Sequence, residues 1–149
     1  MPRRNSHLVI AACCGAGTAY LLAKEAGSSD PFPEVLGGAM GAMATAMLPD
    51  VLDPATSPSH RASGHSLAVA GLISMAVPPC RSFAVECRAS AETLRGLAAQ
   101  PDIQPDQRAD HQLSELASRF AAGFAVGLPV GILSHLGADG FTPSGLPLV

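Results

Sequence analysis

The distribution of charge constrains this chain more than any other feature, because four long stretches contain no Asp, Glu, Lys or Arg. Three of them run to about 19 residues and one to about 15, whereas a helix needs roughly 20 residues to cross a bilayer. Uncharged stretches of this length predict helices that are buried in a protein core or embedded in a membrane. The four stretches are Asn5–Ala23, Val35–Pro49, Ala62–Cys80 and Phe120–Ala138.

The composition favours a membrane protein and argues against nucleic-acid binding. Charged residues make up only 14% and hydrophobic residues 48%, whereas soluble domains carry roughly 25% charge. The net charge is −3 and no basic cluster is present, so no nucleic-acid partner is expected. Aromatic residues are only 4%, without Trp, so the usual interfacial aromatic belt is nearly missing. A soluble bundle of buried helices remains the alternative.

Regularly spaced glycines also favour a membrane. Gly123, Gly127 and Gly131 recur every fourth residue, and Gly37 and Gly41 form a shorter version of the pattern. In lipid such ridges let helix backbones approach closely, whereas in water each glycine costs a helix roughly 1 kcal/mol relative to Ala.

The N-terminal residues argue against a cleaved lipoprotein, and the cysteines argue against a CxxC-type site. Cys13 follows a short match to a lipoprotein cleavage box, but only about five apolar residues precede it, whereas a signal peptide has roughly 7–15. We therefore predict an uncleaved first helix. No CxxC is present, so the cysteines are interpreted as small buried hydrophobic residues. They are Cys13, Cys14, Cys80 and Cys87.

Residues 80–119 hold most of the charge and are predicted to form a connecting segment with an amphipathic helix, Val85 and Leu94 lying on its apolar side. A Pro-rich break follows, and a further helix is expected from near Asp110. We predict one all-α domain over residues 1–149. Its fold is an integral membrane antiparallel helical bundle, with about four membrane-embedded helices plus one amphipathic helix.

This topology brings distant polar residues together. Four antiparallel helices place the N-terminus, the second connection and the C-terminus at the same end of the bundle. Of the five histidines, only His111 falls in the other connection. The candidate metal ligands expected at the shared end are His7, Asp50, Asp53, His60, His65, His135 and Asp139.

These residue types indicate a metal site. His135 and Asp139 are four residues apart, so they share one face of a helix. Mixed His and Asp ligands suit Zn²⁺, Mn²⁺ or Fe and are typical of hydrolytic dinuclear sites. We expect one or two divalent ions, Zn or Mn. Each residue also has a structural alternative, such as a helix cap, a turn residue or a hydrogen-bonded pair at a helix end.

Three residues are candidates for catalysis. Arg61 has the geometry to bind an anionic substrate oxygen bidentately, although a loop arginine facing lipid headgroups or water is equally consistent with its position. Asp50 or Asp53 has the chemistry of a general base wherever it is not a ligand.

The chain resembles the prokaryotic family of predicted membrane-bound metal-dependent hydrolases. The matching pieces are the early His7 and the segments LPDVLDP, HRASGHS and SHLGADGFTPSGLPL. The chain departs from the family pattern at Ala62, Ser63 and Gly64, where a glycine, its neighbour and a threonine are usual. It also has a D-x-x-D spacing in place of the commoner D-x-D-H.

The resemblance implies metal-binding or catalytic roles for His7, Asp50, Asp53, His65, His135 and Asp139, and His60 and Arg61 match its HR pair. It implies hydrolysis of an ester or phosphoester by metal-activated water, on a small-molecule or lipid substrate, at the prokaryotic inner membrane. Membrane lipids and a second copy of the chain are the expected partners. Arg3 and Arg4 favour a cytoplasmic N-terminus. The alternatives are a non-catalytic membrane protein for metal binding or assembly, and a soluble helical interaction domain.

Overall fold

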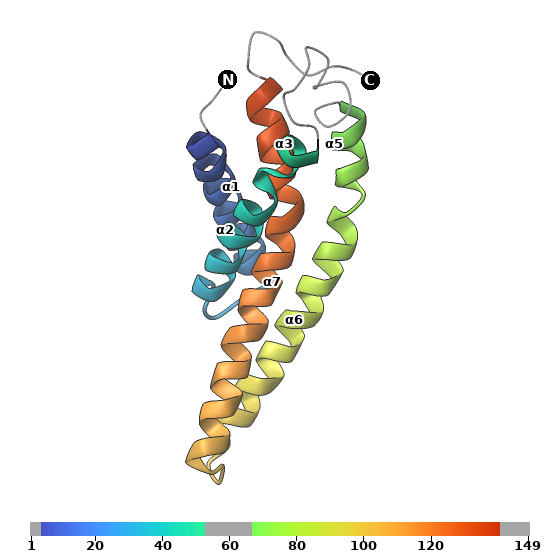
Figure 1. Ribbon diagram of the computed structural model, residues 1–149. Helices are drawn as coiled ribbons and strands as arrows, with labels where there is room; N and C mark the ends of the chain where they lie inside the picture. The colour runs from blue at the N-terminus through green and yellow to red at the C-terminus, as the bar shows by residue number, and fades with distance from the viewer. Residues whose placement is uncertain (1–3, 53–66, 141–149) are drawn as a thin grey trace.

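The computed structural model describes residues 4–52 and 67–140, and every regular element in these ranges is an α-helix (Figure 1). This confirms the predicted all-α class. The helices are α1 (Arg4–Glu25), α2 (Phe32–Ala46), α3 (Leu48–Leu52), α5 (Leu67–Ser74), α6 (Val77–Ala98) and α7 (Pro105–Gly140).

A tight turn between α1 and α2 makes these two helices antiparallel. Gly27 has a φ of 72°, a backbone conformation that glycine adopts without steric cost. Asp30 then accepts a hydrogen bond through Oδ1 from the Phe32 backbone N–H at 3.1 Å. Pro33 follows in the first turn of α2, where a helix does not need the missing N–H group. The turn chemistry of this short segment therefore fixes where α2 begins.

The charged connecting segment differs in detail from the prediction. The amphipathic stretch is not a separate helix but the continuation of α6, which begins at Val77 with prolines in its first turn. The helix expected from Asp110 likewise belongs to α7, which runs unbroken from Pro105 to Gly140. Proline is tolerated in a first turn, so Pro78 and Pro79 mark the start of α6 instead of an interruption.

The packed face of α6 also differs from the predicted one. Ala84 and Ala91 are buried, whereas Val85 is 61% exposed. Ala84 packs against Ala122 and Val126 of α7. In lipid, small residues bring helices together while larger apolar residues face the acyl chains, which is the reverse of the arrangement in a soluble amphipathic helix.

The predicted glycine ridges lie at the centre of the bundle, where α2 packs against both α1 and α7. A Cβ atom on any ridge glycine of α7 would collide with the backbone of α2. The ridge glycines are Gly123, Gly127 and Gly131, and the backbone atoms they meet belong to Glu34, Gly38 and Ala42. A Cβ on Gly15 of α1 would collide with the same Gly38 carbonyl that Gly127 meets. The contact between these helices is therefore mainly backbone against backbone.

A polar contact reinforces this packing near Pro129, which lies inside α7. The Thr45 hydroxyl of α2 donates a hydrogen bond to the Leu128 carbonyl at 2.7 Å. The close approach of the two helices makes this contact between a side chain and a neighbouring backbone feasible.

The cysteine prediction was wrong for α1. Cys13 and Cys14 are exposed, and Cys80 and Cys87 are only partly buried. Alanine and glycine occupy the inner face of α1, because the close approach of α2 leaves no room for a larger side chain. Cys13 and Cys14 are therefore on the outer surface, where lipid would surround them.

Four helical segments of the described chain are long and apolar enough to cross a membrane: Asn5–Glu25, Phe32–Leu52, Ala68–Ala98 and Pro105–Gly140. The start of α1, the short α3 and the end of α7 lie at one end of the bundle (Figure 1), as the antiparallel topology predicted. Along α7, Arg119 and Asp139 are about 30 Å apart, which matches the hydrocarbon thickness of a bilayer. The rest of α7 extends about 20 Å beyond that thickness beside α6.

Candidate metal centre

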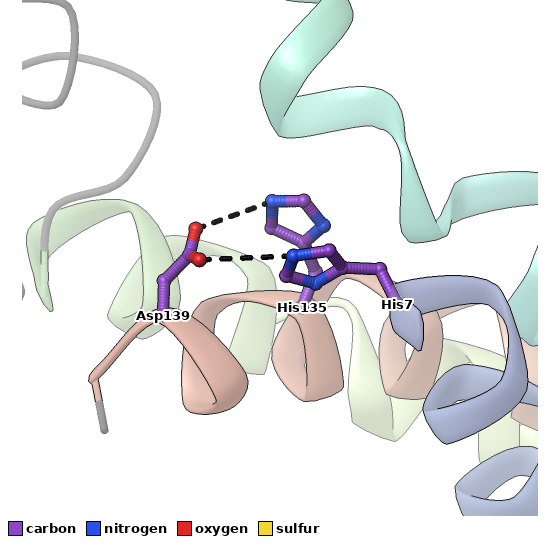
Figure 2. Close-up of side chains that lie close together, drawn as sticks. All are labelled: His7, His135 and Asp139. Atoms are coloured by element: carbon purple, nitrogen blue, oxygen red, sulfur yellow. Dashed lines mark ion pairs between the residues drawn. The ribbon is translucent and has the colours of Figure 1, made fainter. Parts of the chain in front are cut away.

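Three buried side chains meet at the end of the bundle where α1 begins and α7 ends (Figure 2). His7 comes from the start of α1, and His135 and Asp139 come from the last turns of α7. Their exposed fractions are 5%, 1% and 5% respectively. Ionisable groups are costly in a membrane segment and usually have a functional role, so the burial of all three calls for a ligand or a structural partner.

Both histidines direct Nε2 towards the same carboxylate. His7 Nε2 lies 3.8 Å from Asp139 Oδ1, and His135 Nε2 lies 3.4 Å from Asp139 Oδ2. The two rings are stacked, with centroids 4.1 Å apart and planes 28° from parallel. Each histidine therefore presents one ring nitrogen to the same carboxylate. Neutral imidazole is the form that binds metals.

The spacing of these atoms fits a single divalent cation. The two nitrogen–oxygen distances exceed the usual hydrogen-bond range of about 2.7–3.2 Å. Two ligand atoms of a tetrahedral metal, each at about 2.1 Å from the ion, are about 3.4 Å apart. One ligand atom from each of the three residues lies within 4.8 Å of the other two. His7 Nδ1 is also buried without a hydrogen-bond partner among the described residues. The donor set and its spacing therefore fit a metal ion.

Asp50 adds a carboxylate at the edge of this cluster. It lies in α3, the single short turn that follows α2, and its Oδ1 is 3.5 Å from His135 Nε2. Its side chain is 45% exposed, whereas that of His135 is fully buried. Asp50 is thus the one carboxylate of the described cluster that also faces outward.

The structure brings together four of the seven ligands predicted from the sequence. His7, Asp50, His135 and Asp139 meet as the antiparallel topology predicted. The other predicted residues, Asp53, His60, Arg61 and His65, lie outside the described residues. His111 lies far from the cluster, about 36 Å from His135 along α7, as its place in the other connection predicted.

In a comparison with protein-family models, residues 1–149 match the YdjM inner membrane protein family. The chain belongs to this family. Comparisons with curated proteins and with solved structures gave no match. Membership confirms the inner-membrane part of the resemblance seen in the sequence, and the four candidate spans agree with an integral membrane protein. Metal-dependent hydrolysis stays a prediction.

At the opposite boundary, this inner-membrane protein buries a network of ion pairs that the sequence did not reveal. Glu34 of α2 is fully buried, and its Oε2 accepts a hydrogen bond from Arg88 Nε of α6 at 2.8 Å. Arg119 of α7 is 1% exposed and lies 3.9 Å from Glu34 Oε1. It also forms ion pairs with Glu92 at 2.7 Å and Glu115 at 2.9 Å. The only sequence signal was the position of Glu34 directly before an uncharged stretch.

Proposed function

We propose that this YdjM-family protein is a membrane-bound metal-dependent hydrolase of an ester or phosphoester. The observation that carries the proposal is the buried cluster of His7, His135 and Asp139 at the membrane boundary, with Asp50 beside it. Three ligands from α1 and α7, with the second carboxylate, that of Asp50, facing outward, are a suitable frame for water activation. The substrate is a lipid or a small molecule that reaches this boundary.

In this proposal His7, His135 and Asp139 hold a divalent ion, Zn or Mn. Such an ion supplies Lewis acidity and a nucleophile at neutral pH. Asp50 lies 3.5 Å from His135, and in this proposal its partly exposed carboxylate would accept a proton from an attacking water. A second ion would draw ligands from Asp53, His60 and His65. Arg61 would bind an anionic oxygen of the substrate.

A non-catalytic metal-binding role is the second candidate, and the depth of burial favours it. Structural metal sites are closed, whereas catalytic sites keep an open coordination position. The three central ligands are each at most 5% exposed, as in a closed site. The exposed carboxylate of Asp50 favours the catalytic alternative.

Metal analysis of detergent-purified protein tests the site itself. We expect near-stoichiometric Zn or Mn in the wild type and in His111→Ala, the distant histidine control. His135→Ala and Asp139→Asn should lose most of the metal while remaining folded by circular dichroism. Full metal content in both of these variants would exclude the site as described.

Turnover of phosphoester and carboxyl-ester lipids in mixed micelles separates the two functions. Asp50→Asn should retain the metal and lose most of the hydrolysis. Wild-type protein that holds the metal but hydrolyses neither class of substrate would favour the non-catalytic role. We also propose a cytoplasmic N-terminus from Arg3 and Arg4, which reporter fusions at that terminus would test.

A further inference from the structure

Three cavities lie in a row between α1 and α6. Both of these helices pack against α7. Their volumes are about 180, 270 and 250 Å³. The first and second cavities share Leu22, Arg81 and Val126. The second and third share Ala26, Val85 and Arg88. Because neighbouring cavities share lining residues, together they form one continuous groove, called here the α1–α6 groove.

The lining of the α1–α6 groove changes from apolar to charged along its length. Its inner end is formed mainly by apolar side chains, among them Val77, Pro129 and Val130. Its outer end is formed by charged and polar side chains, among them Arg88, Glu92, Arg119 and Ser28. Val130 and Arg119 are about 16 Å apart along α7, so the groove runs from the membrane boundary to about the middle of the hydrocarbon layer.

Arg81 is the unusual residue of this groove. It is exposed, it lies within the candidate span Ala68–Ala98, and it forms no ion pair or hydrogen bond with any described residue. An unpaired arginine in a membrane segment is costly unless it finds an anion or reaches the interface. Arg88 lies two turns further along the same helix, about 10 Å closer to the boundary, and Glu34 engages its Nε and Nη2.

The surrounding charges determine what an anion would meet in the groove. Arg119 is matched by Glu92 and Glu115, and Arg88 is matched by Glu34. Glu25, at the end of α1, lines the middle cavity with no ion pair to a described residue. Arg81 is therefore the cation left for an external anion. Guanidinium groups bind phosphate oxygens in a bidentate manner.

We propose that the α1–α6 groove binds an anionic phospholipid of the surrounding bilayer, with its phosphate on Arg81 and one acyl chain along Val126 and Val130. Basic pockets between membrane helices are known sites for anionic lipid headgroups. The gradient from apolar to charged lining matches the polarity of such a lipid from chain to headgroup. This site is separate from the metal cluster, which lies at the opposite boundary.

Thermal unfolding in neutral detergent micelles, with phosphatidylglycerol or phosphatidylcholine added, tests this proposal. Phosphatidylglycerol should raise the Tm of the wild type by several degrees more than phosphatidylcholine does. Arg81→Gln should lose this difference. Arg108→Gln should keep it, because Arg108 is an exposed arginine whose one side-chain hydrogen bond within the described ranges is to the Gln100 carbonyl, at 3.4 Å. An equal response of the wild type and Arg81→Gln, or no preference for phosphatidylglycerol, would overturn the proposal.

A second variant tests the groove without changing the charge. Val85 lines two of the cavities and is 61% exposed, so Val85→Trp should fill the groove without disturbing the packing against α7. Native mass spectrometry should then show phosphatidylglycerol retained by the wild type and lost from Val85→Trp, with an unchanged Tm in lipid-free micelles. Lipid retained by Val85→Trp would count against this groove. His135→Ala should keep the lipid. Loss of the metal site should therefore leave lipid binding unchanged, and the two proposals can be refuted separately.

Discussion

Replacing Glu34 with glutamine is expected to lower the free energy of unfolding by about 3 kcal/mol, the low end for removing one partner of a buried ion pair. Glu34 is fully buried, and Arg88, whose side chain is 13% exposed, contacts it at 2.7 Å. The glutamine keeps the shape of the side chain but leaves the Arg88 guanidinium without a counter-charge. Arg119 retains Glu92 and Glu115, so only one cation is left unpaired and the loss stays near this lower limit.

The double variant Glu34→Gln, Arg88→Met separates the cost of an unpaired charge from the loss of the hydrogen bonds. Replacing a whole buried ion pair with neutral residues is often close to neutral. We therefore expect the double variant to be at least about 1.5 kcal/mol more stable than Glu34→Gln alone, which is about half of the expected loss. Glu92→Gln is the matched control, because its side chain is 55% exposed. It should cost less than about 1 kcal/mol.

Equilibrium unfolding in mixed micelles of neutral detergent and SDS, with pulse proteolysis to count folded molecules, would measure these differences. If the double variant were as unstable as the sum of its single variants, Glu34 and Arg88 would not be coupled. The network would then stabilise the bundle only through separate contacts of each residue.

Two further predictions concern the contact between α2 and α7. Gly127→Ala should cost about 1–3 kcal/mol by overpacking, because its Cβ would collide with the Gly38 carbonyl, whereas Gly17→Ala has open space around its Cβ and should be neutral or stabilising. Thr45→Val should cost about 1 kcal/mol, as for other hydrogen bonds between membrane helices, because it removes the 2.7 Å bond to the Leu128 carbonyl. The same unfolding assay checks both, and a stable Gly127→Ala or an unchanged Thr45→Val would contradict them.

Much of the candidate site was predictable because it depends on position along helices more than on side-chain detail. The uncharged stretches located the membrane-spanning helices, and the antiparallel order placed their ends. His135 and Asp139 lie one turn apart on any helix, and His7 stands where the first helix begins. These positions along the helices bring the three residues together without any knowledge of side-chain packing. The position of Asp50 directly after the second stretch placed it nearby.

The ion-pair network and the packed face of α6 were not predictable in this way. Glu34 has the sequence position of an ordinary acidic residue in the first turn of a helix, which usually faces water. Its partners Arg88 and Arg119 lie on other helices, so only the tertiary packing reveals them. On α6, Val85 was expected to face the bundle. It faces outward because lipid solvates large apolar side chains as well as a protein core does.

The origin of the metal cluster in the first and last helices also determines when it can form during synthesis. His7, at the start of α1, leaves the ribosome long before His135 and Asp139, which lie near the end of α7. By contrast, Glu34 can meet Arg88 as soon as α6 has been inserted. The cluster is therefore completed only after α7 has been translated and inserted, and a product that stops before α7 lacks His135 and Asp139.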